Sequence, residues 1–119
     1  MKERRQFHRV AQTLEGRYRV SGEFTSAVKP MTLLNLGAGG VRFRGSELLE
    51  KHQMIEIEAA VPGLRGTLVV KGRVAWSAMR ASGVAETGAE FMEISPDQRF
   101  QIDKIVQFLR GASQAPPAA

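Results

Sequence analysis

The sequence contains no cysteine, only two histidines and no long run of apolar residues. Without cysteine there are no disulfides, thiolate nucleophiles or cysteine metal sites. His8 and His52 lie far apart in the chain, so we expect neither a catalytic site, a metal site nor a bound cofactor. No segment resembles a membrane span or the apolar core of a signal peptide, and we therefore expect a cytoplasmic protein without membrane insertion.

Arginine, in contrast, is abundant. Twelve arginines and five lysines stand against twelve acidic residues, which gives a net charge of +5 at pH 7. The planar guanidinium group binds phosphate and the edge of guanine through paired hydrogen bonds, which an ammonium group cannot do. On charge alone, nucleic acid, an acidic membrane and a phosphorylated small molecule all remain candidate partners.

The 119 residues predict a single domain built mainly of strands. A glycine cluster and then strict alternation follow Asn35, Gly72 suggests a bulge, and residues 46–51 suggest one helical turn. Strands are predicted over 10–20, 26–36, 41–45, 54–61, 64–79 and 88–94, with a loop at 81–88 before the last of them. Because no strand–helix alternation is visible, this order predicts an antiparallel barrel or sandwich.

A single helix is predicted near the C-terminus. Ser95 is suited to the N-cap, Pro96 to the first helical position and Gln98 to a capping box. Gly111 is expected to end the helix. The apolar residues recur at helical spacing and form one stripe that is expected to pack on the strands: Ile102, Ile105, Val106 and Leu109.

Two short segments hold candidate binding residues. Arg4, Arg5 and Arg9 surround one aromatic residue near the N-terminus, and alone they are typical of a solvated basic terminus. The second segment is Asn35-Leu-Gly-Ala-Gly-Gly40, where glycines allow a ligand to approach the backbone closely. Asn35 offers both a donor and an acceptor to a base edge. Taken separately, each segment is a weak signal.

Together, about twenty-six residues apart, the two segments resemble the motifs of the PilZ domain, a bacterial receptor module for cyclic di-GMP. That family has an R-x-x-x-R motif before its first strand and a [D/N]-x-S-x-x-G motif between the next two strands. Arg5 and Arg9 match the first motif, and Asn35 and Gly40 match the ends of the second. The later segments GRVAW, GAEF and SPDQRFQIDKIVQFL also resemble the family. The resemblance implies an all-β fold, a six-stranded antiparallel barrel with a C-terminal α-helix.

The resemblance also implies a ligand site. Arg5 and Arg9 would clamp phosphate and the Hoogsteen edge of guanine, and Asn35 would address its Watson–Crick edge. In this family an arginine directly before the first motif, here Arg4, is associated with an intercalated ligand dimer. The glycines that keep the surface open to the ligand are Gly37, Gly39 and Gly40.

One position departs from the family pattern, because Gly37 stands where the motif has serine. A neutral hydrogen bond contributes roughly 0.5–1.5 kcal/mol and a bond from arginine roughly 1.5–3 kcal/mol, so we expect weaker binding rather than none. Arg42 and Arg44 lie on the outer face of a strand near the site and are secondary candidates, either solvated or in contact with phosphate. Trp76 is interpreted as part of the barrel core or rim rather than as a stacking platform, which is the alternative.

These observations predict a non-enzymatic receptor or adaptor that binds cyclic di-GMP, orders its N-terminal arm on the ligand and acts on an effector protein. The alternative is a degenerate PilZ-like adaptor that works by protein contacts without nucleotide. A barrel that binds single-stranded nucleic acid is disfavoured, because the few aromatic residues form no stacking row. The expected divisions are an arginine-rich arm at 1–9, the barrel and helix at 10–111, and a disordered tail at 112–119.

Overall fold

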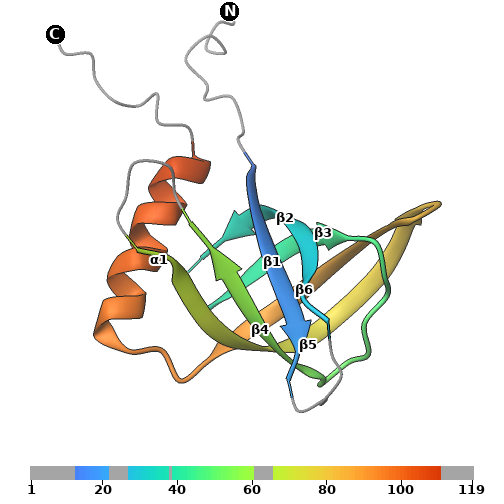
Figure 1. Cartoon of the computed structure of the whole chain (residues 1–119), viewed down its shortest axis with the longest axis horizontal. Coiled ribbons are helices and arrows are strands. Elements are labelled where there is room, and N and C mark those ends of the chain that lie inside the picture. Colours follow the sequence, from blue (N-terminus) through green and yellow to red (C-terminus); the bar gives the residue numbers. More distant parts are fainter. Residues whose placement is uncertain (1–12, 22–26, 38, 61–65, 111–119) are drawn as a thin grey trace, which may run out of the picture.

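A computed structural model describes residues 13–21, 27–37, 39–60 and 66–110. Within these residues the chain forms six strands and one helix: β1 (Leu14–Val20), β2 (Lys29–Leu36), β3 (Gly40–Gly45), β4 (Met54–Ala59), β5 (Leu68–Ala81), β6 (Val84–Met92) and α1 (Pro96–Leu109). All strand pairs are antiparallel, and the sheet closes into a barrel in the order β1-β2-β3-β6-β5-β4 (Figure 1). The prediction of a six-stranded antiparallel barrel with a C-terminal helix is confirmed.

The inward-facing side chains of the strands form one apolar core. Tyr18 and Phe43 belong to it with their ring centroids 5.4 Å apart, and both residues are buried. Ile55 and Ile57 of β4 point inward as their alternation predicts, with 0% and 1% of their surface exposed. Alternation identifies these residues because one face of every strand in a closed barrel meets the core.

Helix α1 begins as the sequence predicts. The Ser95 side chain accepts a hydrogen bond from the backbone N–H of Gln98, whose side chain in turn accepts one from the Ser95 backbone. The helix packs against β2 and β5 beside one end of the barrel (Figure 1), and it buries Ile102, Ile105 and Leu109. No helix in the described ranges has the length and apolar character needed to cross a membrane.

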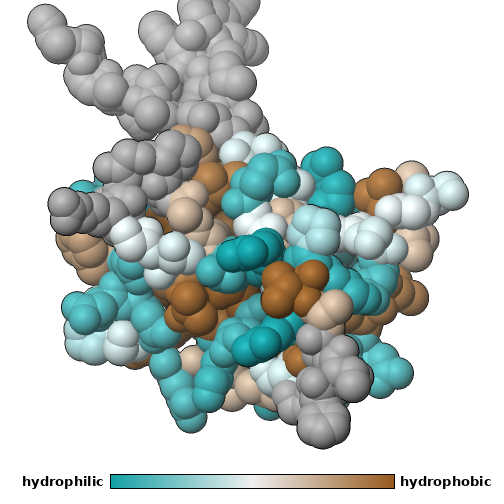
Figure 2. Space-filling view, in the orientation of Figure 1, coloured by the Kyte–Doolittle hydropathy of each residue, from teal (hydrophilic) through white to brown (hydrophobic). Residues whose placement is uncertain are grey.

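The outer face of β1 and β4 carries opposite charges in adjacent rows. Arg17 pairs with Glu58 and Arg19 with Glu56, each at 3.2 Å. Figure 2 shows hydrophilic side chains on this face, with apolar patches between them. Exposed pairs of this kind contribute only about 0–1 kcal/mol each, so the core rather than this surface holds the barrel together.

Two local predictions are wrong. Residues 46–51 form no helical turn, because long-range contacts hold this connection in another conformation: Glu47 accepts hydrogen bonds from Tyr18 and Lys29, and the Leu49 N–H donates to Ser77 Oγ. Residues 81–88 are not a loop.

Strand β6 begins at Val84, since Ala81 and Val84 are paired across a turn in which Gly83 adopts a φ of 74°. A left-handed glycine is well suited to so short a reversal. The hairpin of β5 and β6 is therefore longer than expected, and the outward-facing residues of 84–87 belong to the sheet.

Candidate ligand-binding groove

Four residues from four strands form one row across the outside of the barrel. Asn35 of β2 is paired with Arg42 of β3, Arg42 with Gly88 of β6, and Gly88 with Trp76 of β5. The three with side chains point outward and are exposed, while Gly88 is buried. The row therefore joins a residue of the second motif to residues that lie 41 and 53 positions further along the chain.

Two β-bulges determine that the ends of this row face outward. In β2 the alternation places Met31 and Leu33 in the core, and Asn35 would follow them inward if the strand were regular. One extra residue between Leu33 and Asn35 reverses the alternation, so the Asn35 side chain points outward. A second bulge, between Val74 and Trp76, does the same in β5. The bulge suggested at Gly72 thus lies a few residues later, and both bulges turn a side chain to the surface.

Gly37, Gly39 and Gly40, which we call the glycine segment, lie where β2 passes into β3, next to the row. The ends of this segment are joined by a 2.9 Å hydrogen bond from the Gly37 N–H to the Gly40 carbonyl, and Phe91 of β6 donates to the Gly39 carbonyl at 2.9 Å. A Cβ on Gly37 or Gly39 would meet no atom within 4 Å, whereas one on Gly40 would lie 2.4 Å from the Ala89 carbonyl oxygen. Gly40 is thus required by strand packing, while the other two leave open space.

The row and the glycine segment line an open hollow of about 440 Å³, which we call the groove. Its size is within the range of small-molecule sites in proteins. The lining comes from β2, β3, β5, β6 and the glycine segment: Asn35, Leu36, Gly37, Gly39, Gly40, Val41, Arg42, Ala75, Trp76, Gly88, Ala89 and Glu90.

Trp76 forms one wall of the groove and was not predicted there. Its side chain is 39% exposed, and its ring lies against the backbone of Gly88, where an added Cβ would be 2.3 Å from the indole Nε1. Regular alternation from Val70 and Val74 assigns Trp76 to the core, and only the bulge moves it outside. The one sequence signal for this position is Gly88, since a strand glycine often lies beneath a cross-strand aromatic ring.

The charged groups around the groove are largely paired with one another. Arg42 Nη1 donates to Glu86 Oε2 at 2.8 Å, and Arg73 Nη2 donates to Glu90 Oε2 at 3.1 Å. Glu86 also accepts from Arg80 Nε at 2.8 Å. The hydrogen bond from Arg80 is the main cause that lowers the pKa of Glu86, and the charges of Arg42 and Arg80 add to it. Glu86 is therefore ionised at neutral pH.

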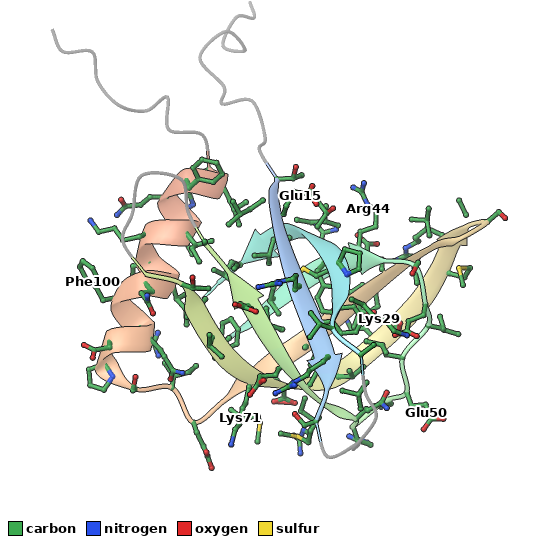
Figure 3. All side chains as sticks on the ribbon, viewed as in Figure 1. Glu15, Lys29, Arg44, Glu50, Lys71 and Phe100 are labelled. Atoms are coloured by element: carbon green, nitrogen blue, oxygen red, sulfur yellow. The ribbon has the colours of Figure 1, made fainter. Side chains whose placement is uncertain are left out.

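The sequence-predicted candidates are thus partly brought together. Asn35 and Arg42 line the groove with all three motif glycines, Gly37, Gly39 and Gly40. Arg44 does not line it, because it lies two residues further along β3, opposite Glu86, and projects away from the barrel (Figure 3). Arg4, Arg5 and Arg9 lie outside the described residues.

Comparisons with known proteins agree with the fold and with the family resemblance. The PilZ domain family model matches residues 3–111. The PilZ domain of CeSA from a cellulose-synthesizing bacterium superposes with a TM-score of 0.61 at 16% identity, covering 86% of this chain and 97% of that one. The PilZ domain of Escherichia coli YcgR with c-di-GMP gives 0.61 at 15% identity, over 85% and 90% of the two chains. None of the curated protein sequences matches the chain. Since the family model spans nearly the whole sequence, the chain belongs to the PilZ domain family.

Proposed function

We propose that this protein is a cyclic di-GMP receptor that binds its ligand in the groove and passes the signal to a partner protein in the bacterial cytoplasm. The observation that supports the proposal most is the position of the second motif. Asn35 and Gly40, which match the ends of the second family motif, line the same hollow as Arg42 and Trp76. The family model that covers residues 3–111 supports the same ligand class.

Each groove residue has chemistry that suits a guanine nucleotide. The amide of Asn35 can donate to and accept from the Watson–Crick edge of guanine. Trp76 is 39% exposed, and the accessible part of its ring offers a surface for base stacking, which contributes about 1–3 kcal/mol per base. Gly37 and Gly39 leave their surroundings open, so a base or phosphate can approach the backbone there.

The charges of the described groove make the N-terminal arginines essential to the proposal. Among the described residues, Arg42 and Arg73 at the groove are each engaged by a glutamate, so little uncompensated positive charge faces a ligand with two phosphates. Arg5 and Arg9 of the first motif would supply it and would contact the phosphates and the guanine Hoogsteen edge. Binding would bring the arginine-rich segment onto the groove and so change the surface that a partner meets.

The test is calorimetric titration of the purified protein with cyclic di-GMP. We expect binding to the wild type, and losses of roughly 1.5–3 kcal/mol for each of Arg5→Ala and Arg9→Ala, the contribution of a hydrogen bond to a charged group. Lys51→Ala is a control of matched charge on a loop away from the groove. The proposal fails if the wild type binds nothing at high micromolar ligand.

The same titration reports the stoichiometry. Arg4 precedes the first motif directly, so we propose that the ligand binds as an intercalated dimer and that two molecules bind per chain. Arg4→Ala should lower the ratio to one while leaving binding measurable. A ratio of one in the wild type would contradict the dimer but not the receptor.

A second function is favoured by Gly37. Without the motif serine, and with the groove arginines already paired, the chain would be an adaptor that acts by protein contacts and needs no nucleotide. In that case Arg5→Ala and Arg9→Ala leave the cellular function intact, whereas a receptor loses it. Either function is that of a binding protein rather than an enzyme.

A further inference from the structure

Glu86 occupies an unusual place beside the groove. It lies on the outer face of β6 between two arginines, and each carboxylate oxygen accepts one hydrogen bond of 2.8 Å: Oε1 from Arg80 Nε and Oε2 from Arg42 Nη1. Its side chain is only 14% exposed, against 44% for Arg42 and 54% for Arg80. One partly buried carboxylate therefore fixes two guanidinium groups that are more open to solvent.

The two arginines contact different parts of the groove lining. Arg42 is itself a wall residue, next to Asn35 in the cross-strand row. Arg80 does not line the groove, but its Cζ lies 5.7 Å from the centroid of the Trp76 ring, within the range of a cation–π contact. Trp76 is thus held by the Gly88 backbone and by Arg80, and Arg80 is held by Glu86.

We propose that Glu86 is a positioning residue of the groove, which orients Arg42 directly and Trp76 through Arg80 for an anionic purine nucleotide that Glu86 itself does not touch. The inference rests on the proposed function for the identity of the ligand. Arg42 uses one of its five N–H donors on Glu86 and keeps the others for a ligand. A side chain that is ordered before binding loses less conformational freedom when the ligand arrives.

A simple charge argument predicts the opposite effect of Glu86. A carboxylate near the site of a dianionic ligand repels it, so its removal should tighten binding. Glu90 provides the comparison, because it lines the groove, pairs with Arg73 at 3.1 Å and is half exposed. Glu86→Gln and Glu90→Gln each remove one negative charge beside the groove, but only the first removes a carboxylate that holds two wall residues.

The experiment measures cyclic di-GMP affinity for the wild type, Glu86→Gln, Glu90→Gln and Glu58→Gln. Glu58 pairs with Arg17 away from the groove and serves as the matched control. We expect Glu86→Gln to weaken binding by about two- to tenfold, as for one lost hydrogen bond, Glu90→Gln to tighten it, and Glu58→Gln to leave it unchanged. Unchanged or tighter binding by Glu86→Gln overturns the proposal, and so does an equal loss in Glu90→Gln.

A second readout needs no ligand. Trp76 is the only tryptophan of the chain, so quenching of its fluorescence by acrylamide reports directly on the solvent accessibility of its ring. In the ligand-free protein Glu86→Gln should raise the quenching constant, and Glu58→Gln should match the wild type, with thermal melts confirming that both are folded. An unchanged quenching constant in Glu86→Gln overturns the positioning role. If the wild type fails to bind cyclic di-GMP but quenching rises, the proposed ligand is wrong while the positioning of Trp76 stands.

Discussion

Restoring the motif serine is the sharpest test of the groove, and Gly37→Ser is a change that the fold accepts. A Cβ at this position would meet no atom within 4 Å, and the backbone of Gly37 is not in the left-handed region. The variant therefore adds a hydroxyl to the groove lining without strain. Replacing glycine at a compatible position also leaves folding stability the same or slightly higher, because the unfolded chain loses freedom.

The expected gain follows from one added neutral hydrogen bond. Such a bond contributes about 0.5–1.5 kcal/mol net, which is about a two- to tenfold lower Kd for cyclic di-GMP. Calorimetric titration resolves a change of this size, and the enthalpy should become more favourable with an unchanged stoichiometry.

Gly39→Ser is the matched control. Gly39 lines the same groove, and an added Cβ would likewise meet no atom within 4 Å, but its position in the motif is not the serine position. We expect no gain in affinity from it. If Gly37→Ser binds no tighter than the wild type, or if Gly39→Ser gains as much, the hydroxyl has no specific place in the site and the residue-by-residue match to the motif is refuted.

Three further changes test the packing of the barrel. Gly40→Ala should lower the free energy of unfolding by about 1–3 kcal/mol, because its Cβ would lie 2.4 Å from a backbone oxygen of β6; thermal melts measure this, with the two serine variants as controls. Gly88→Ala should displace the Trp76 ring, since its Cβ would come within 2.3 Å of Nε1; a shift of the tryptophan emission at nearly native circular dichroism is expected, and an unchanged spectrum would contradict the contact. The hydrogen bond from Tyr18 to Glu47 should make stability depend on pH at both extremes. That bond is the main cause that lowers the pKa of Glu47. The stability that ionised Glu47 contributes is therefore complete above its ordinary pKa of 4.5 and is lost as the pH falls below that value. The pKa of Tyr18 is raised, first by burial and secondly by Glu47. The stability that the protonated Tyr18 hydroxyl contributes is therefore complete below its ordinary pKa of 10 and is lost at higher pH. Glu47→Gln should flatten the acid limb of a denaturation profile, and an acid limb equal to that of the wild type would refute the assignment.

The strands could be predicted because a closed barrel imposes a period of two wherever a strand is regular. Val41, Phe43, Ile55 and Ile57 all face the core, as their alternation predicts. The helix could be predicted because its start uses a capping box that depends only on neighbouring residues. Both signals are local, so neither required knowledge of the other strands.

The site was only partly predictable because the places of Glu86 and Arg42 in it depend on pairing between strands far apart in the sequence. Glu86 was assigned to a loop, since a two-residue turn after a long strand leaves little sequence signal apart from Gly83. Arg42 appeared as a free surface cation, yet its partner lies 44 residues away on β6. Whether a surface arginine is available or already engaged depends on strand register, which residue types alone do not specify.

The shape of the groove follows from the position of two extra residues rather than from the identity of the motif residues. The middle of the cross-strand row, Arg42 and Gly88, comes from regular parts of β3 and β6. Its ends, Asn35 and Trp76, face outward only because one bulge precedes each of them. A related chain with the same motif letters but a regular β2 would direct its asparagine into the barrel, beside Met31 and Leu33, where no ligand could reach it. In this chain, therefore, Asn35 of the motif reaches the surface only because β2 carries the additional residue.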